Sequence, residues 1–323
     1  MTERASIGID VGGTKTLCIL VNEKLETLAK VKFKTEPTLG QKRFSAELIA
    51  AIKILKRVAK RKGLALAGAG IGFAGQVDKI KCHVRKAPNI RSLEDYPIGK
   101  MIADETGLEC VIGNDVHLGL YAEHQVGAAK GCSHVLGVFF GTGVGGAAIV
   151  NGQLYEGATG FGGQVGCILA QPVGGPKAAL SHGIVDRIAS KASIASEALQ
   201  MAVKNWAPYL HQRVGTDLAK VGWRILAKAI ASGDRQVEDM LRARLQVVGI
   251  ALSNVVNFMN PDMVVLGGGL TDEMPKLVLE ELGEGLRTHL VPEVAAALKI
   301  KAAKLGGGAV AIGGAKLALV ELD

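Results

Sequence analysis

Aromatic residues are scarce in this chain, since Phe, Trp and Tyr together make up 4% of its 323 residues. The hydrophobic core must therefore consist largely of Ala, Val, Ile and Leu. Long apolar runs are also missing, because Gly or a charged residue interrupts each one before the roughly 18 residues needed to cross a bilayer. No signal peptide precedes the first predicted strand. We expect a cytoplasmic protein without a membrane partner.

Cysteine is infrequent, and the sequence contains no C-x-x-C pair. The scattered cysteines fit reduced, mostly buried thiols, as expected in the cytoplasm. A hydrophobic content of 48% with 21% charged residues is typical of a well-packed globular protein, and the length allows two domains. The five cysteines are Cys18, Cys82, Cys110, Cys132 and Cys167.

Positive charge is in excess, with a formal net charge of +8. Ala50, Ile54, Leu55 and Val58 recur at helical spacing in the most basic stretch, which favours an amphipathic helix with a solvated basic face. The alternative is a surface that attracts a polyanion, either nucleic acid or a polyphosphate chain. The stretch has no aromatic residue for base stacking, which argues against single-stranded nucleic acid. Its cations are Lys53, Lys56, Arg57, Lys60, Arg61 and Lys62.

A glycine-rich turn between two apolar runs occurs twice. The copies span residues 7–22 and 136–151 and superpose without a gap, so that Gly12 matches Gly141. Each copy predicts strand, turn and strand, and the nearly bare turn can close its backbone N–H groups on an anion. One copy alone would fit a simple glycine-rich hairpin equally well, whereas two in register favour two related α/β halves that hold phosphate between them. The turn residues are Gly12, Gly13, Thr14 and Lys15, then Gly141, Thr142 and Gly143.

Strands alternate with helices along the chain, which indicates a parallel or mixed sheet covered by helices. In such sheets the chemistry gathers at the carboxyl ends of the strands, where we expect the loop with Gly75 and the pair Asn114-Asp115. The natural domain boundary falls near residue 115. We predict strands over 27–34, 67–75, 109–112 and 263–266, helices over 41–62, 97–106 and 116–127, an irregular stretch over 76–96, mostly helical sequence over 178–260, and a C-terminal helix.

Two aspartates are candidates for chemistry. Asp10 ends the first strand, and its counterpart in the repeat is Phe139, so the hairpin itself requires no carboxylate. This difference favours an Asp10 that orients hydrated Mg²⁺ beside a transferable phosphate, although a local turn hydrogen bond is the alternative. Asp115 could accept a proton from a substrate hydroxyl. Local sequence alone favours a helix N-cap for the Asn114-Asp115 pair.

Five motifs follow one another in a characteristic order: Asp10 to Lys15, Gly72 to Asp78 with the later Pro88-Asn89, Asn114-Asp115, Gly141 to Gly146, and Gly267 to Gly269. In this order and spacing the chain resembles the ROK family, which comprises sugar kinases and related repressors within the actin/hexokinase-like superfamily. The resemblance covers essentially the whole chain. It implies an α/β fold of two actin-like (ribonuclease H-like) domains with a cleft between them. The smaller domain would be residues 1–115, completed by the C-terminal helix at about 305–323, and the larger one residues 116–304.

The resemblance also implies an activity and a role for each matching residue. The protein would be an ATP-dependent sugar kinase and a homodimer, with Asp115 as the general base and Asp10 holding Mg²⁺ through water. The sugar would lie at Gly75, Asn89, Asn114, Gln164 and Cys167. The ATP phosphates would lie at Gly12, Gly13, Thr14, Lys15, Gly141, Thr142 and Gly143, and the adenosine against Gly267, Gly268 and Gly269.

One loop departs from the family pattern. Family kinases carry Gly-Glu-x-Gly-His, whereas this chain has Gln164 and Cys167 in place of the Glu and His. The zinc pattern Cys-x-Cys-Gly-x-x-Gly-Cys is replaced by residues 171–183, which contain no cysteine, and one Cys with the distant His182 cannot complete a tetrahedral site. We therefore predict no structural zinc. Because a glutamine lacks the charge and a thiol is a poor hydrogen-bond partner, a preference for glucose or an N-acetylhexosamine does not carry over, and we expect an unusual sugar or a cyclitol.

Two other functions compete with the kinase, and the kinase itself has a variant. A transcriptional repressor of this family needs a helix-turn-helix ahead of the first strand, which we expect at about residue 6, so we expect no DNA partner. The altered loop leaves open a sugar- or nucleotide-binding protein without catalysis. The basic helix leaves open a kinase that takes polyphosphate as its donor.

Overall fold

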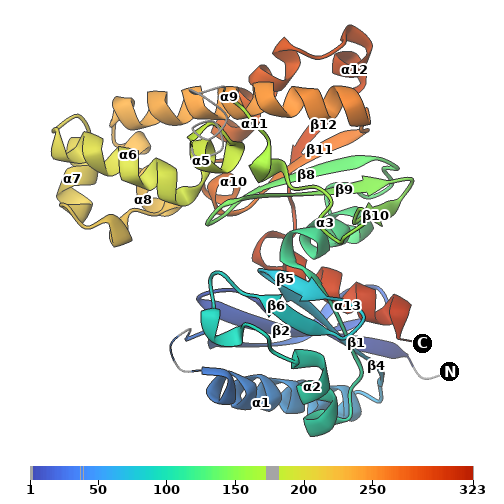
Figure 1. The fold of residues 1–323 in the computed structure, drawn as a ribbon. Coiled ribbons are helices and arrows are strands. Elements are labelled where there is room, and N and C mark those ends of the chain that lie inside the picture. The colour runs from blue at the N-terminus through green and yellow to red at the C-terminus, as the bar shows by residue number, and fades with distance from the viewer. Residues whose placement is uncertain (1–2, 37, 39, 172–181, 323) are drawn as a thin grey trace. The chain divides into compact units, whose positions relative to one another are not determined.

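The computed structural model describes residues 3–36, 38, 40–171 and 182–322. It divides into two compact units, with residues 1–127 and 307–323 in unit 1 and residues 128–306 in unit 2. Each unit is built on a five-stranded sheet with helices packed against it (Figure 1). This arrangement confirms the predicted α/β class.

The sheet of unit 1 contains the first glycine-rich hairpin. Strands β1 and β2 pair antiparallel, β3 adds to β2 as an antiparallel edge strand, and β4 and β7 follow on the other side as parallel strands. The bounds are β1 (Arg4–Val11), β2 (Lys15–Asn22), β3 (Thr27–Lys34), β4 (Ala65–Phe73) and β7 (Cys110–Asn114).

The sheet of unit 2 repeats this plan around the second hairpin. Its order, β10-β9-β8-β11-β12, has an antiparallel hairpin with one outer antiparallel strand on one side and two parallel strands on the other. The prediction that the two halves share one strand plan is therefore confirmed. The bounds are β8 (Val135–Phe140), β9 (Val144–Val150), β10 (Gln153–Tyr155), β11 (Met263–Gly267) and β12 (Lys299–Ala302).

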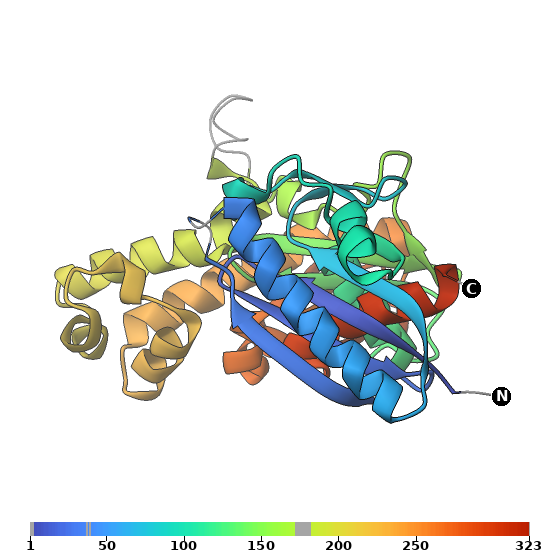
Figure 2. The ribbon, with the colours of Figure 1, turned by 90° about the horizontal axis from the view of Figure 1, so that it is seen from below.

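Helices cover both faces of the unit 1 sheet. Helix α1 lies across the strands on one face (Figure 2), where Leu48 and Ile52 pack into a core with Ile7 and Ile9. Helix α13 covers the opposite face. The elements are α1 (Gly40–Arg61), α2 (Ile98–Thr106), α3 (Asp115–Val126), α13 (Ala309–Glu321), the 3₁₀ turn η1 (Arg91–Leu93) and a small hairpin of β5 (Gln76–Asp78) and β6 (His83–Lys86).

Glycines allow α13 to approach the sheet closely. A Cβ atom on Gly70 would lie only 1.8 Å from the carbonyl oxygen of Gly314. Helix α3 packs against α13 in the same way, since a Cβ on Gly313 would lie 1.9 Å from the carbonyl oxygen of Leu118. These contacts place α3 in unit 1, so the boundary falls after Gly127, whereas the sequence led us to expect it near residue 115.

Helices of unit 2 pack on one another as well as on the sheet. The long helix α9 runs along α11, and glycine again permits the contact, because a Cβ on Gly249 would lie 2.4 Å from the carbonyl oxygen of Leu282. Among the described residues, no helix combines the length and apolar content that crossing a membrane requires. The elements are α5 (Val185–Ala189), α6 (Lys191–Val203), α7 (Pro208–Val214), α8 (Trp223–Ala231), α9 (Arg235–Met259), α10 (Gly269–Glu273), α11 (Pro275–Thr288), α12 (Pro292–Ala297) and the 3₁₀ turns η2 (Val165–Cys167) and η3 (Leu218–Lys220). A further 3₁₀ turn, η4 (Gly306–Gly308), spans the boundary at which the chain returns to unit 1.

Candidate active site

Three parallel strands of unit 1 bring polar residues to one edge of the sheet. Asp10 of β1 is in register with Gly72 of β4, and Phe73 of β4 is in register with Asn114 of β7. Parallel strands end at the same edge, so Asp10, the loop after Phe73 and the Asn114-Asp115 pair gather there. The sequence predicted this grouping.

The first glycine-rich turn lies at the same edge. It is closed by a hydrogen bond from the Gly12 N–H to the Lys15 carbonyl oxygen at 3.1 Å. Asn89 lies beside it, because a Cβ atom on Gly13 would be 3.4 Å from the Cβ of Asn89. A predicted sugar-binding residue and a predicted phosphate-binding turn are therefore neighbours within unit 1.

Gly75 follows β4 in a place where a side chain would not fit. A Cβ atom there would lie 2.2 Å from the carbonyl oxygen of Lys86 in β6, and the Gly75 N–H donates to the carbonyl of Phe73 at 2.9 Å. The glycine thus lets the loop after β4 pass directly over the β5–β6 hairpin. The segment around it was predicted to be irregular, and the β5–β6 hairpin corrects that prediction for residues 76–78 and 83–86.

Asn114, not Asp115, caps helix α3. Its Oδ1 atom accepts hydrogen bonds from the backbone N–H groups of Val116 at 3.0 Å and His117 at 3.3 Å. Asp115 is the first residue of the helix. The N-cap oxygen of α3 is therefore supplied by the neighbour of Asp115, and not by Asp115 itself.

The two aspartates have raised pKa values. Burial raises the pKa of Asp10 to about 7, the negative charge of Asp115 adds to the increase, and Lys15 opposes it. Burial also raises the pKa of Asp115 to about 6, against hydrogen bonds from the backbone N–H of Val116, from its own N–H and from the Asn114 side chain. Carboxyl groups perturbed in this way, close together at a sheet edge, are typical of functional sites.

The second glycine-rich turn is held by a residue that the sequence did not point to. The Gly141 N–H donates to the Gly143 carbonyl at 2.8 Å, and Asp186 of α5 accepts the Val144 N–H on its Oδ1 atom at 2.7 Å. A Cβ atom on Gly143 would lie 2.5 Å from the same oxygen. We found no local signal for Asp186, because it lies in a stretch that the sequence marked only as helical.

The predicted adenosine-binding glycines follow β11 and sit against buried groups of unit 2. Gly268 has a left-handed φ of +85°, and a Cβ there would lie 2.4 Å from the Phe140 carbonyl oxygen. A Cβ on Gly269 would lie 2.7 Å from Cδ1 of Trp223. Glycine is thus required sterically at both positions, which leaves the backbone of this turn bare.

The loop at residues 163–167, which departs from the family pattern, exposes its two unusual residues, Gln164 and Cys167, to solvent. Val165 and Gly166 are buried, and a Cβ on Gly166 would lie 2.2 Å from the Val144 carbonyl oxygen, whereas Gln164 and Cys167 are exposed. Gln164 also borders a largely apolar hollow of about 520 Å³. The replaced zinc pattern falls mostly on residues 172–181, outside the described residues. Within the described part of the chain, no three His, Cys, Asp or Glu side chains are grouped so as to hold a metal ion.

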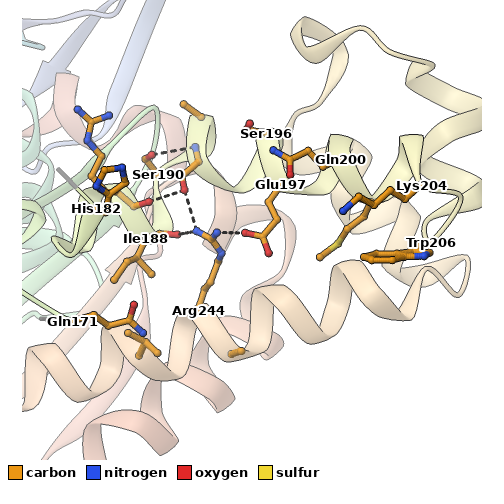
Figure 3. Close-up of a pocket in the computed structure, with 16 residues that line it drawn as sticks. Gln171, His182, Ile188, Ser190, Ser196, Glu197, Gln200, Lys204, Trp206 and Arg244 are labelled. Atoms are coloured by element: carbon orange, nitrogen blue, oxygen red, sulfur yellow. Dashed lines mark hydrogen bonds and ion pairs between the residues drawn. The ribbon is translucent and has the colours of Figure 1, made fainter. Parts of the chain in front are cut away.

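A larger hollow of unit 2, of about 920 Å³, lies between α6 and α9 (Figure 3). Arg244 spans it by donating hydrogen bonds to the Ser193 hydroxyl at 3.0 Å, to the Ile188 carbonyl and to the Glu197 carboxylate. This network joins the two helices. None of the predicted site residues lines the hollow, so we do not assign the substrate to it.

Comparison with known proteins identifies the family. Glucokinase from Halalkalibacterium halodurans is 27% identical over 97% of this chain and 94% of its own length. Glucokinase from Streptomyces coelicolor is 29% identical over 97% of both chains. The crystal structure of a ROK family glucokinase from Streptomyces griseus, in complex with glucose and AMPPNP, matches with a TM-score of 0.81 and 28% identity over 98% of this chain and 99% of that one. The family model described as ROK matches residues 6–321, and the chain therefore belongs to the ROK family.

Proposed function

We propose that this chain is an ATP-dependent sugar kinase, a phosphotransferase with an alcohol group as acceptor. The observation that carries the proposal is the position of Asp115 at the start of α3. Asn114 supplies the N-cap of the helix, and a pKa of about 6 suits Asp115 as a base that works near neutral pH. The glucokinases to which the chain is similar support the reaction class.

In the proposed reaction, Asp115 removes the proton from the attacking hydroxyl of the acceptor. Asn89 and Asn114 orient the hydroxyl groups of the acceptor, and the backbone at Gly75 is a further proposed contact with the acceptor. Gln164 and Cys167 are the proposed contacts from unit 2. The hydroxyl oxygen forms a bond to the γ-phosphorus, the bond to the bridging oxygen of ADP breaks, and the proton stays on Asp115.

The residues fit a magnesium-bound nucleotide. Asp10 supplies a hard oxygen ligand, and the burial of its carboxylate beside Asp115 leaves negative charge that a cation would offset. We propose that Asp10 holds Mg²⁺ through water and that the glycine-rich turns at residues 12–15 and 141–143 hold the phosphates, with Gly267, Gly268 and Gly269 against the adenosine. When bound, the cation neutralises charge on the transferring phosphoryl group.

The acceptor is proposed to be a sugar or a cyclitol other than the usual family substrates. The reason is chemical: Gln164 is neutral and Cys167 is a weak hydrogen-bond partner, so a site using them would select different hydroxyl groups. We also propose a homodimer, on the family resemblance, and a cytoplasmic location, on the scattered cysteines. We propose that the protein has no structural zinc, because residues 171–183 depart from the family's zinc pattern and contain no cysteine.

A coupled assay that follows ATP conversion to ADP tests the proposal. Aldoses, ketoses, amino sugars and cyclitols would be compared with Mg²⁺ present and zinc omitted. One strong acceptor would support the kinase and define what the loop at 163–167 recognises. ATP binding without turnover on any acceptor would favour the alternative, a sugar- or nucleotide-binding protein without catalysis.

A further inference from the structure

A row of lysines follows the edge strand of unit 1. Lys30, Lys32 and Lys34 alternate along β3, and all three are exposed. The strand contains no acidic residue. No carboxylate forms an ion pair with any of the three within the described residues. The row is therefore a line of uncompensated positive charge on a rigid element.

The strand register joins this row to the first glycine-rich turn. Lys34 of β3 is directly opposite Lys15 of β2, and Lys32 and Lys30 continue along the strand opposite Leu17 and Ile19. Residues directly opposite one another in an antiparallel pair project from the same face. Lys15 is itself exposed, so the row begins at the turn that we propose holds phosphate.

The lysine row and the basic helix α1 lie on opposite faces of the sheet. Phe33, which alternates with the lysines, packs its ring against Phe44 of α1 with a centroid distance of 6.0 Å. Ile19, opposite Lys30, instead belongs to the cluster with Ala311 and Ala315 of α13. The excess charge of α1 and the charge of β3 are thus separate features.

The spacing and composition of the row define a ligand. Alternate residues on a strand are about 6.6 Å apart, so the row extends about 13 Å from Lys34 to Lys30. Ammonium groups act as point charges for phosphate. The outward positions from Lys30 to Lys34 offer no aromatic ring for stacking and no amide for reading a base. A linear chain of phosphates without bases fits these groups, and a nucleic acid would use only its backbone.

We propose that Lys15, Lys34, Lys32 and Lys30 form a track that binds linear inorganic polyphosphate, with one end of the chain at the turn formed by residues 12–15. The proposal rests on the phosphate-binding role of that turn in the proposed function. Lysines on an edge strand commonly prevent pairing with a second sheet. In this protein the lysines of β3 would bind a ligand instead.

Direct binding of sodium polyphosphate to the full chain, without sugar, tests the track. The variant Lys30→Gln/Lys32→Gln/Lys34→Gln is compared with the matched variant Lys42→Gln/Lys53→Gln/Lys60→Gln on α1, which removes the same charge from the other face. We expect the β3 variant to bind at least about tenfold more weakly and the logarithmic salt slope to fall by about 2, as for three lost phosphate contacts. The α1 variant should change affinity by less than about threefold.

Tripolyphosphate provides the length control. It is too short to reach Lys30 from the turn, so the single change Lys30→Gln should weaken the binding of long-chain polyphosphate and leave that of tripolyphosphate almost unchanged. Equal losses in the β3 and α1 variants would mean general charge attraction and would overturn the track. Aggregation of the β3 variant with unchanged affinity would do the same, in favour of edge protection. Tight polyphosphate binding without sugar phosphorylation would count against the proposed function only. ATP-dependent turnover, together with polyphosphate binding that the β3 changes do not alter, would count against the track only.

Discussion

Asp10 and Asp115 stand at the ends of two strands that flank β4, and the charge of Asp115 raises the pKa of Asp10. Burial acts on both groups in the same direction. Two interacting carboxyl groups lose their protons in steps that belong to the pair. The pair therefore changes charge close to neutral pH, which affects both stability and the proposed chemistry.

The first prediction concerns stability. Asp10→Asn should make the protein without Mg²⁺ more stable at pH 8, by about 1–3 kcal/mol. The folded pKa of about 7 exceeds the unfolded value, so the native state binds the proton more tightly and loses stability as pH rises between about 4 and 7. The gain should shrink at pH 5, where the native carboxyl group is mostly neutral. Urea unfolding in EDTA at both pH values measures it.

A surface aspartate provides the control for this change. Asp104 is exposed and pairs with Lys100 on α2, so Asp104→Asn should alter stability by less than about 0.5 kcal/mol at either pH. If Asp10→Asn proved less stable than the unaltered chain at pH 8, the fold would favour the charged form of Asp10, and burial could not be the dominant influence on its pKa.

The second prediction concerns the general base. Asp115→Asn should reduce turnover by about 10²–10⁴-fold, because the attacking hydroxyl loses its proton acceptor, while ATP affinity changes little. The cap by Asn114 remains, so helix α3 should keep its start. Steady-state kinetics and ATP titration separate the two effects. Turnover within a few-fold of the original would remove Asp115 from the mechanism.

The third prediction concerns Asp186. Asp186→Ala leaves the Val144 N–H without its acceptor and should loosen the turn at 141–143, raising KM for ATP by about tenfold with little change in KM for the sugar. Asp186→Asn retains an oxygen that can accept this hydrogen bond and should be much milder. Equal effects of the two variants, or an effect on the sugar alone, would argue against a positioning role at this turn.

Much of the fold could be predicted because its pattern is local. The two hairpins could be predicted from the repeated glycine-rich turn. Strand β3 occupies the predicted residues 27–34. The strands β5, β6, β10 and β12 were not predicted. They contain only three or four residues each, too few for an alternation to stand out, and β12 carries Lys299 and Lys301 because it is an edge strand.

The sequence located candidate site residues only where they follow strand ends. Asp10, Asn114 and Asp115 were located in this way, and the structure distinguishes the capping residue from its neighbour, which local sequence could not. Asp186 escaped notice because its partner Val144 lies on another element far along the chain. The attachment of α3 to unit 1 escaped for the same reason, since it depends on contact with the C-terminal helix α13.

The last prediction concerns the glycine contact between β4 and α13. Gly70→Ala adds a methyl carbon that would lie only 1.8 Å from the Gly314 carbonyl oxygen. Because the two atoms cannot approach so closely, α13 must shift away from the sheet. We expect a loss of about 1–3 kcal/mol or more in unfolding free energy, with faster proteolysis near the C-terminus. Gly119→Ala is the control, because the nearest atom to its added Cβ is 3.8 Å away, and alanine favours the interior of helix α3 by about 0.5–1 kcal/mol. If both changes lowered the unfolding free energy equally, the close approach of β4 and α13 would not be the reason for glycine at position 70.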